Sequence, residues 1–494
     1  MTRDRYGFLL LLHAEWTKFR TVRGWVTGTV AAALLVVLFA VLAGIGGGGD
    51  GGPDVPVGPD GGPVTDSFYL VHRPLTGDGS VTAAVSAPRS SLPRGLADLR
   101  PGRVPWSKAG LIIKAGTRQG SPYAAIMLTG GHGVRMQDGY TRDTPGPAGA
   151  APRWLRLDRS GEEVTGLASA DGTHWTRVGT VRVRGLGTTV LGGPFVASPP
   201  AVRGMGTSGS VSTAVFEDLH AEGGWADGKW RGEQVGPRSP TFSGYPRNVA
   251  GSVAEEGGRL TVTGAGDIAP AVRASLPTGG TLGEILTGAF AALVAVVVIG
   301  TQFITSEYRG SLIHLTLAAA PRRGRVLAAK AIVLWTVTFA AGFVGAAVAV
   351  PVGGRLARAS GVYVFPVAFA TELRVVAGIA ALLATASVLA LAVGAVLRHG
   401  AGAVTAVVAG IVLPYVLVAI PFMPAGVSNW AARVTPAAAF AVQQTLVPYD
   451  QVASVYTPYE GYYPLPPWAG LGVLAGYAAA ALAVAAVLLH RRDA

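Results

Sequence analysis

The chain contains no cysteine, few charged residues and no complete phosphate-binding loop. The lack of cysteine excludes disulfide bonds, thiolate zinc sites and thiol nucleophiles. Residues 223–230 have the glycine and lysine spacing of a phosphate-binding loop, but Trp230 stands where serine or threonine must bind magnesium. The eight histidines are scattered, without the spacing of a metal site. We therefore expect no cofactor, no metal and no enzymatic activity in this chain.

Charge is scarce because the chain is apolar. Of its 494 residues, 50% are hydrophobic and 14% charged, and the mean hydropathy is +0.42. These values are typical of a polytopic membrane protein with an attached polar domain. The net charge of +12 is concentrated outside the polar segment 46–282, which carries only about +3. Lysine and arginine at cytoplasmic span ends explain this excess, so we do not expect nucleic-acid binding.

Six apolar runs are each near the length that spans a bilayer. None has an ionisable residue deep within it, which argues against an ion-coupled transporter. The basic loops place both termini in the cytoplasm of a cell-membrane protein and segment 46–281 outside. The expected spans are 25–45, 282–304, 332–352, 375–397, 401–423 and 468–489.

The polar segment begins with a flexible linker at 46–65, rich in glycine and proline. Short alternating runs between turn residues then predict an all-β sandwich over 66–222. Asp171 and Gly172 predict a hairpin turn, and we expect Trp154 and Trp175 to pack in the core of the sandwich. A β-rich extension of unassigned fold is expected over 223–281.

The segments around Trp106, Trp154 and 169–175 resemble a concanavalin-like sandwich of a bacterial type. Such folds include lectins. The resemblance therefore implies a glycan or envelope component as a ligand of the extracytoplasmic domain, by analogy of fold alone.

The sequence of residues 1–24 predicts an amphipathic helix at the cytoplasmic boundary. Loop 305–330 predicts a short helix that is flanked by charged residues and that a soluble partner could bind. Both stretches resemble type 2 ABC exporter permeases, in which they form an elbow helix and an ATPase-coupling helix. The elbow residues that carry the resemblance are Glu15, Trp16, Lys18 and Arg20. The corresponding coupling residues are Glu307, Tyr308, Arg309, Gly310, Arg322, Arg323 and Arg325.

The expected fold is thus an α-helical polytopic membrane protein with six transmembrane helices and an inserted all-β sandwich domain outside the cell. Residues 282–494 form the five-helix remainder of the permease. The resemblance implies export of a substrate driven by a separate ABC ATPase subunit, with the permease paired to itself or to a sister permease. The alternative is a non-transporting surface receptor or sensor whose lectin-like domain binds glycan.

Overall fold

The computed structural model describes most of the chain in nine stretches. They are residues 2–46, 55–93, 99–148, 153–203, 206–236, 251–276, 279–309, 323–419 and 425–492. The chain divides into two compact units. A helical unit comprises Met1–Pro53, Thr278–Val447 and Tyr456–Ala494, and a β unit comprises Asp54–Pro277 and Pro448–Val455.

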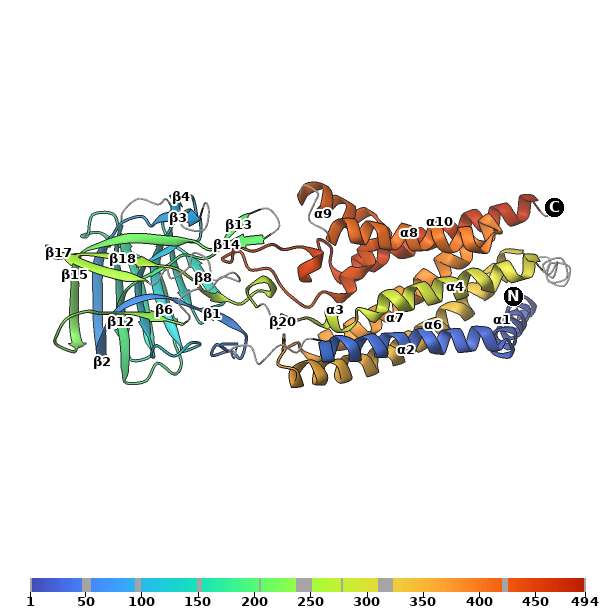
Figure 1. Ribbon diagram of the computed structural model, residues 1–494, viewed down its shortest axis with the longest axis horizontal. Helices are drawn as coiled ribbons and strands as arrows, with labels where there is room; N and C mark the ends of the chain where they lie inside the picture. The colour runs from blue at the N-terminus through green and yellow to red at the C-terminus, as the bar shows by residue number, and fades with distance from the viewer. Residues whose placement is uncertain are drawn as a thin grey trace. The chain divides into compact units, whose positions relative to one another are not determined.

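The helical unit holds nine described α-helices (Figure 1). Six of them, α2, α4, α6, α7, α8 and α10, are long and apolar enough to cross a membrane. The helices are α1 (Thr2–Thr21), α2 (Arg23–Gly46), α3 (Leu282–Ile285), α4 (Gly288–Arg309), α6 (Arg323–Ala359), α7 (Phe369–Leu397), α8 (Gly400–Ala419), α9 (Ala425–Val434) and α10 (Pro467–Arg492). Short elements complete the unit: 3-10 helices Pro436–Gln443 and Pro458–Glu460, and the parallel strands β20 (Gly279–Gly280) and β21 (Tyr363–Val364).

The six candidate spans correspond to the six predicted runs, but α6 differs in length. Its 37 residues begin at Arg323, nine positions before the predicted start at residue 332. At 1.5 Å per residue it is about 55 Å long, well beyond a hydrocarbon core of about 30 Å. The additional turns hold Lys330, which is fully buried. The sequence placed Lys330 in the loop, whereas it lies two turns inside the helix.

Helix α7 is the centre of the helical unit and packs against α4, α6 and α10. Small residues allow these helices to approach closely. A methyl group at Gly300 of α4 would overlap the carbonyl oxygen of Ser387 on α7, and one at Gly342 of α6 would lie 3.2 Å from the Cα of Ala380. The buried core of the unit therefore depends on close contact between helix backbones.

The β unit is dominated by one antiparallel sheet, in which nine strands follow the order β11-β10-β9-β2-β12-β5-β6-β7-β8. These strands are β2 (Phe68–Val85), β5 (Lys108–Lys114), β6 (Tyr123–Thr129), β7 (Val134–Asp138), β8 (Arg142–Pro145), β9 (Arg153–Ser160), β10 (Glu163–Ser169), β11 (Trp175–Arg182) and β12 (Thr189–Ala197). The other strands are β1 (Val64–Asp66), β3 (Arg89–Pro93), β4 (Leu99–Pro101), β13 (Ala201–Arg203), β14 (Gly206–Ser208), β15 (Val211–Trp225), β16 (Arg231–Val235), β17 (Ser252–Glu256), β18 (Arg259–Gly264) and β19 (Ile268–Pro270).

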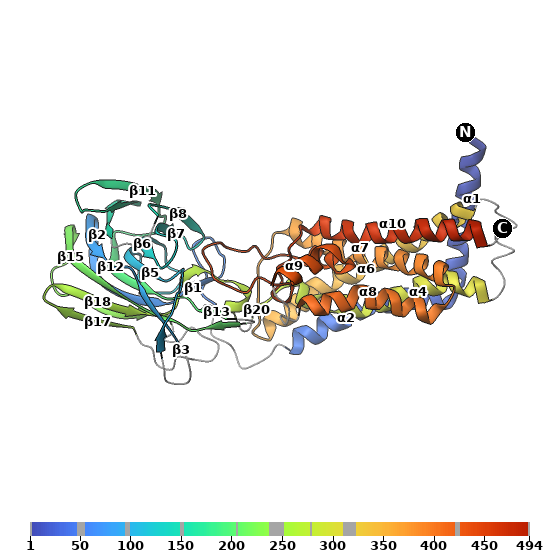
Figure 2. The ribbon, with the colours of Figure 1, turned by 90° about the horizontal axis from the view of Figure 1, so that it is seen from above.

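The sheet curls so that its two ends face each other (Figure 2). Strand β2 pairs with β12 along its first half and with β9 along its second half. A Cβ at Gly166 on β10 would lie 2.9 Å from the sulfur of Met136 on β7. A hydrophobic cluster fills the space between the facing layers. This arrangement fits the predicted sandwich.

Strands β5 and β6 are buried on both faces, because a second hydrophobic cluster covers their other side. On that side β1 pairs with β19, the first and last strands of the unit. Two buried ion pairs attach these strands to β5: Lys114 with Asp66 at 2.8 Å and Lys108 with Asp267 at 2.5 Å. The start and end of the polar segment are therefore fixed to the centre of the sheet.

Two predictions about the polar segment need correction. The boundary predicted at residue 222 falls inside β15, which pairs with both β2 and β18, while β16 pairs with β2. Residues 223–270 thus belong to the same unit as the sandwich. Trp154 and Trp175 are only half-buried and lie outside both hydrophobic clusters, because they flank the hairpin turn at the sheet edge.

Candidate functional site

The predicted elbow forms α1, and Figure 2 shows it crossing the direction of the long helices at one end of the helical unit. Its residues divide between two faces. Glu15 and Phe19, four positions apart, are 3% exposed, whereas Trp16 and Arg20 are exposed. Residues four apart share a helix face, so the buried face carries one carboxylate and one aromatic ring toward the neighbouring helices.

The buried carboxylate of α1 meets charges from α4 and α6. Lys330 Nζ lies 2.7 Å from Glu15 Oε2 and 2.7 Å from Glu307 Oε1. Lys18 also pairs with Glu307 and lies 3.8 Å from Glu15. The side chains of Glu15, Glu307 and Lys330 are at most 4% exposed, and that of Lys18 is 34% exposed. We call these four residues the elbow charge cluster, which holds two positive and two negative charges.

Three aromatic rings lie beside the elbow charge cluster. Phe19 of α1 contacts Trp25 of α2 and Phe303 of α4, with ring centroids 6.0 and 5.7 Å away. The Lys330 ammonium lies 4.6 Å from the centroid of the Phe303 ring, within the range of a cation–π interaction. The apolar rings exclude water on one side of the charges, so the ion pairs are less screened than surface pairs. Helices α1, α2, α4 and α6 are thereby joined at one place.

The residues predicted to couple to an ATPase are dispersed around this joint. Glu307 is 2% exposed, so any part it plays in coupling acts through its ion pairs. Arg398 lies over the Tyr308 ring at 4.9 Å, and Arg323 donates a hydrogen bond to the Leu489 carbonyl of α10 at 2.6 Å. Arg325 is half-buried in α6.

The middle of the coupling loop lies outside the described residues. Gly310 and Arg322 fall in 310–322, the stretch on which the predicted coupling helix mostly lies, and of Arg309 only the backbone is described. The structure therefore locates the two flanks of that helix, the end of α4 and the start of α6.

The sequence analysis assigned no role to Lys330, Phe19 or Phe303. Lys330 is the last residue of the predicted loop 305–330, and its partner Glu15 lies 315 positions away. A lysine directly before an apolar run was a usable signal, because a charge at a span end needs either water or a partner. The identity of that partner could not be inferred, since contact between α1 and α6 is a property of the folded chain.

The other motifs of the sequence have structural roles. In 169–175, the Asp171 carboxylate accepts hydrogen bonds from the backbone of Thr173 and His174, both at 2.9 Å, which closes the predicted hairpin turn. In 223–230, the ring centroids of Trp225 and Trp230 are 5.8 Å apart, and the Arg73 guanidinium lies over the Trp230 ring. The side chains of this segment therefore pack against the β unit. Among the described residues, no three His, Asp or Glu side chains are grouped as a metal site would require.

Comparisons with known proteins agree with the helical unit. A family described as "ABC-2 family transporter protein" matches residues 139–494, which include α4, α6, α7, α8 and α10. No curated protein matches the chain.

Three solved structures share partial likeness. A functionally unknown protein from Saccharomyces cerevisiae has 15% identity and a TM-score of 0.23, over 35% of this chain and 84% of its own. SCP-B, a member of the Eqolisin family of peptidases in complex with a tripeptide, has 9% identity and a TM-score of 0.25, over 40% and 98%. The GH43 protein BlXynB from Bacillus licheniformis, in a mutant form, has 15% identity and a TM-score of 0.21, over 30% and 27%. At these TM-scores the likenesses carry no argument about fold or function.

Proposed function

Because the chain belongs to the ABC-2 family of transporter proteins, we propose that it exports a substrate using ATP hydrolysed by a separate ATPase subunit. The observation that carries the proposal is the family match over residues 139–494, which makes the chain a membrane subunit of an ABC transporter. Membership of a transporter family gives no support to the surface-receptor alternative. Glycan binding by the β unit stays a prediction.

The elbow charge cluster suggests how such coupling would work. The flanks of the predicted coupling helix are α4, which carries Glu307, and α6, which carries Lys330. Both residues are tied to α1 by ion pairs. If an ATPase binds residues 310–322 and moves them, the ion pairs make α1, α4 and α6 move together. Small movements are transmitted efficiently in this way because packed helices resist continuous deformation.

The partners in this proposal are an ABC ATPase, the lipid bilayer, and a second copy of the chain or a sister permease. The helical unit leaves apolar faces of α2, α8 and α10 exposed, with Val30, Leu34, Leu413 and Val484 at 51–61% exposure. A bilayer or a partner permease would cover such faces.

The orientation is proposed with both termini in the cytoplasm and the β unit outside, on the strength of the basic loops. The chain has no cysteine, so an introduced one is its only thiol. In intact cells, a cysteine at the exposed position Thr207 should react with an impermeant thiol reagent, and a cysteine at Ser311 should react only after permeabilisation. Labelling of the Ser311 variant in intact cells would reverse the orientation.

Coupling is tested with the chain and its candidate ATPase in nanodiscs. Glu307→Ala should reduce stimulation of ATP hydrolysis by the chain through loss of the ion pairs, and Arg323→Glu should reduce it by reversing a charge at the loop flank. Arg433→Gln, which removes an exposed charge of α9 outside the elbow and the coupling loop, is the matched control. Full stimulation by both variants, with ATPase binding unchanged, would mean that this region only fixes topology.

A further inference from the structure

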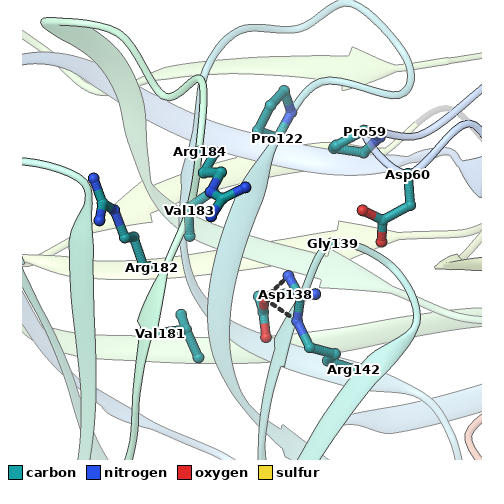
Figure 3. A pocket seen from close by; sticks show the side chains of 10 residues that line it. All are labelled: Pro59, Asp60, Pro122, Asp138, Gly139, Arg142, Val181, Arg182, Val183 and Arg184. Carbon is teal, nitrogen blue, oxygen red and sulfur yellow. Dashed lines mark hydrogen bonds and ion pairs between the residues drawn. The ribbon is translucent and has the colours of Figure 1, made fainter.

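The β unit contains a pocket of about 410 Å³, within the size range of small-molecule sites. Its walls come from the turn between β7 and β8, from the end of β11, and from the stretch before β1 (Figure 3). Val181 and Val183 supply apolar wall, and the remaining polar lining includes two carboxylates and three guanidinium groups. Nothing in the proposed transport cycle requires this pocket.

One of the two carboxylates is already satisfied. Asp138 is buried and accepts hydrogen bonds from Arg142 Nε at 2.6 Å and Nη2 at 2.5 Å. Both nitrogens contact the same carboxylate oxygen, Oδ2, and this charge-assisted pair lies in the lining of the pocket. The pair is neutral, so Asp138 adds little attraction for a cation.

The remaining charges are only partly compensated. Arg182 pairs with the exposed Glu162 at 3.0 Å. Arg184 is exposed, and among the described residues its guanidinium makes no hydrogen bond or close ion pair, although its charge contributes to lowering the pKa of Glu162, after the larger effect of Arg182. Asp60 is likewise exposed on another wall, and its charge contributes to raising the pKa of Arg142, after the larger effect of Asp138. Figure 3 shows Arg184 and Asp60 on different sides of the same space.

A guanidinium without a partner favours a planar anion such as carboxylate, or a phosphate, which it can bind through two hydrogen bonds. A carboxylate without a partner accepts hydrogen bonds from hydroxyl groups or from an ammonium group. Arg184 lies in the same pocket as Asp60, and its positive charge opposes an ammonium group, which leaves neutral hydroxyl donors as the better match for Asp60. We propose that the pocket binds a small acidic polyol, a sugar acid or sugar phosphate, with its anionic group on Arg184 and hydroxyl groups on Asp60.

The test is a titration of the purified full-length chain in nanodiscs, without any ATPase, by isothermal titration calorimetry. The probes are glucuronate and glucose 6-phosphate, with glucose and inorganic phosphate as half-ligands. We expect saturable binding of at least one acidic sugar, and binding at least about tenfold weaker for each half-ligand. Binding should also weaken as salt is raised, since the anionic contact is exposed.

Variants assign the contacts. Arg184→Gln should weaken binding of the acidic sugar by about tenfold or more, because a charge-assisted hydrogen bond is lost. Asp60→Asn should weaken it while leaving the weak binding of inorganic phosphate unchanged. Arg177→Gln removes an exposed arginine elsewhere on β11 and should have no effect. Unchanged thermal unfolding of each variant shows that the fold is retained.

Three results would overturn the proposal: no saturable binding of either acidic sugar, equal affinity for inorganic phosphate and the acidic sugar, or binding unaffected by Arg184→Gln. Because the ATPase is absent, such a failure leaves the transport proposal untouched. A failure of ATPase stimulation would equally leave this site untouched.

Discussion

Replacing Lys330 by methionine should destabilise the helical unit severely. Methionine keeps most of the side-chain volume, so the change removes the charge and little packing. Glu15 and Glu307, both at most 4% exposed, are then left with Lys18 as their remaining partner in the elbow charge cluster. Removing one partner of a buried ion pair costs about 3–5 kcal/mol, chiefly because a charge remains without compensation. We expect a loss of this size in the free energy of unfolding.

The double variant Lys330→Met with Glu307→Gln tests the mechanism. It restores neutrality, with Lys18 and Glu15 as the remaining pair. We therefore expect it to recover about half of the lost stability or more, a positive coupling in a double-mutant cycle. Unfolding by a denaturing detergent, followed by circular dichroism in a common mild detergent, gives the free energies. Arg20→Gln, the exposed control on α1, should change stability by less than about 0.5 kcal/mol.

A loss below about 1 kcal/mol for Lys330→Met would refute this reasoning. That value is typical of a solvent-exposed ion pair. It would mean that water reaches the cluster and that α1 is not fixed to α4 and α6 by these charges. A double variant as unstable as the sum of the two single changes would refute the pairing itself.

Two further predictions concern single contacts. Gly300→Ala should lower the free energy of unfolding by about 1–3 kcal/mol, because the added methyl group overlaps the Ser387 carbonyl between α4 and α7. Gly410→Ala, on the open face of α8, is the control and should not lower it. Equal melting temperatures of the two variants would contradict the close packing of α4 and α7. In the β unit, the hydrogen bond that the Asp171 carboxylate accepts from the His174 ring raises the pKa of His174 above its ordinary 6.5. The stabilising effect of this pair is therefore present below about pH 6.5 and is lost as the pH rises through the raised pKa. NMR titration of the His174 ring should show its pKa fall in Asp171→Asn, and an unchanged pKa would exclude the pair.

Much of the architecture could be predicted because its signals are local. The six candidate spans follow from runs of apolar residues, each a property of about 20 neighbours. The turn at Asp171 and Gly172 was predicted correctly because Gly172 adopts a positive φ of 80°, which glycine tolerates. The predicted resemblance to ABC transporter permeases is confirmed by the family that matches residues 139–494.

Other features depended on long-range contacts. The predicted boundary at residue 222 was wrong because turn-rich sequence after β15 gave no sign that β16 returns to pair with β2. Pro448–Val455, which lies between the predicted spans 401–423 and 468–489, belongs to the β unit, where Gln451 donates a hydrogen bond to the Thr141 carbonyl at 3.0 Å. The prediction that Trp154 and Trp175 pack in the core was wrong. The order of the strands in the sheet decides how far a residue lies from the core, and local sequence does not specify that order.

The sequence by itself determined the apolar spans, the β character of the polar segment and the basic loops on which the proposed orientation rests. Each of these three features is set by whether residues that are neighbours in the sequence are apolar or polar, and the sequence gives this directly. Only the tertiary structure decided that Glu307 is buried, that Lys330 neutralises it, and that Glu15 completes the cluster from 315 positions away. Burying a charge is unfavourable unless a partner lies within a few ångströms, and folding alone brings such distant partners together.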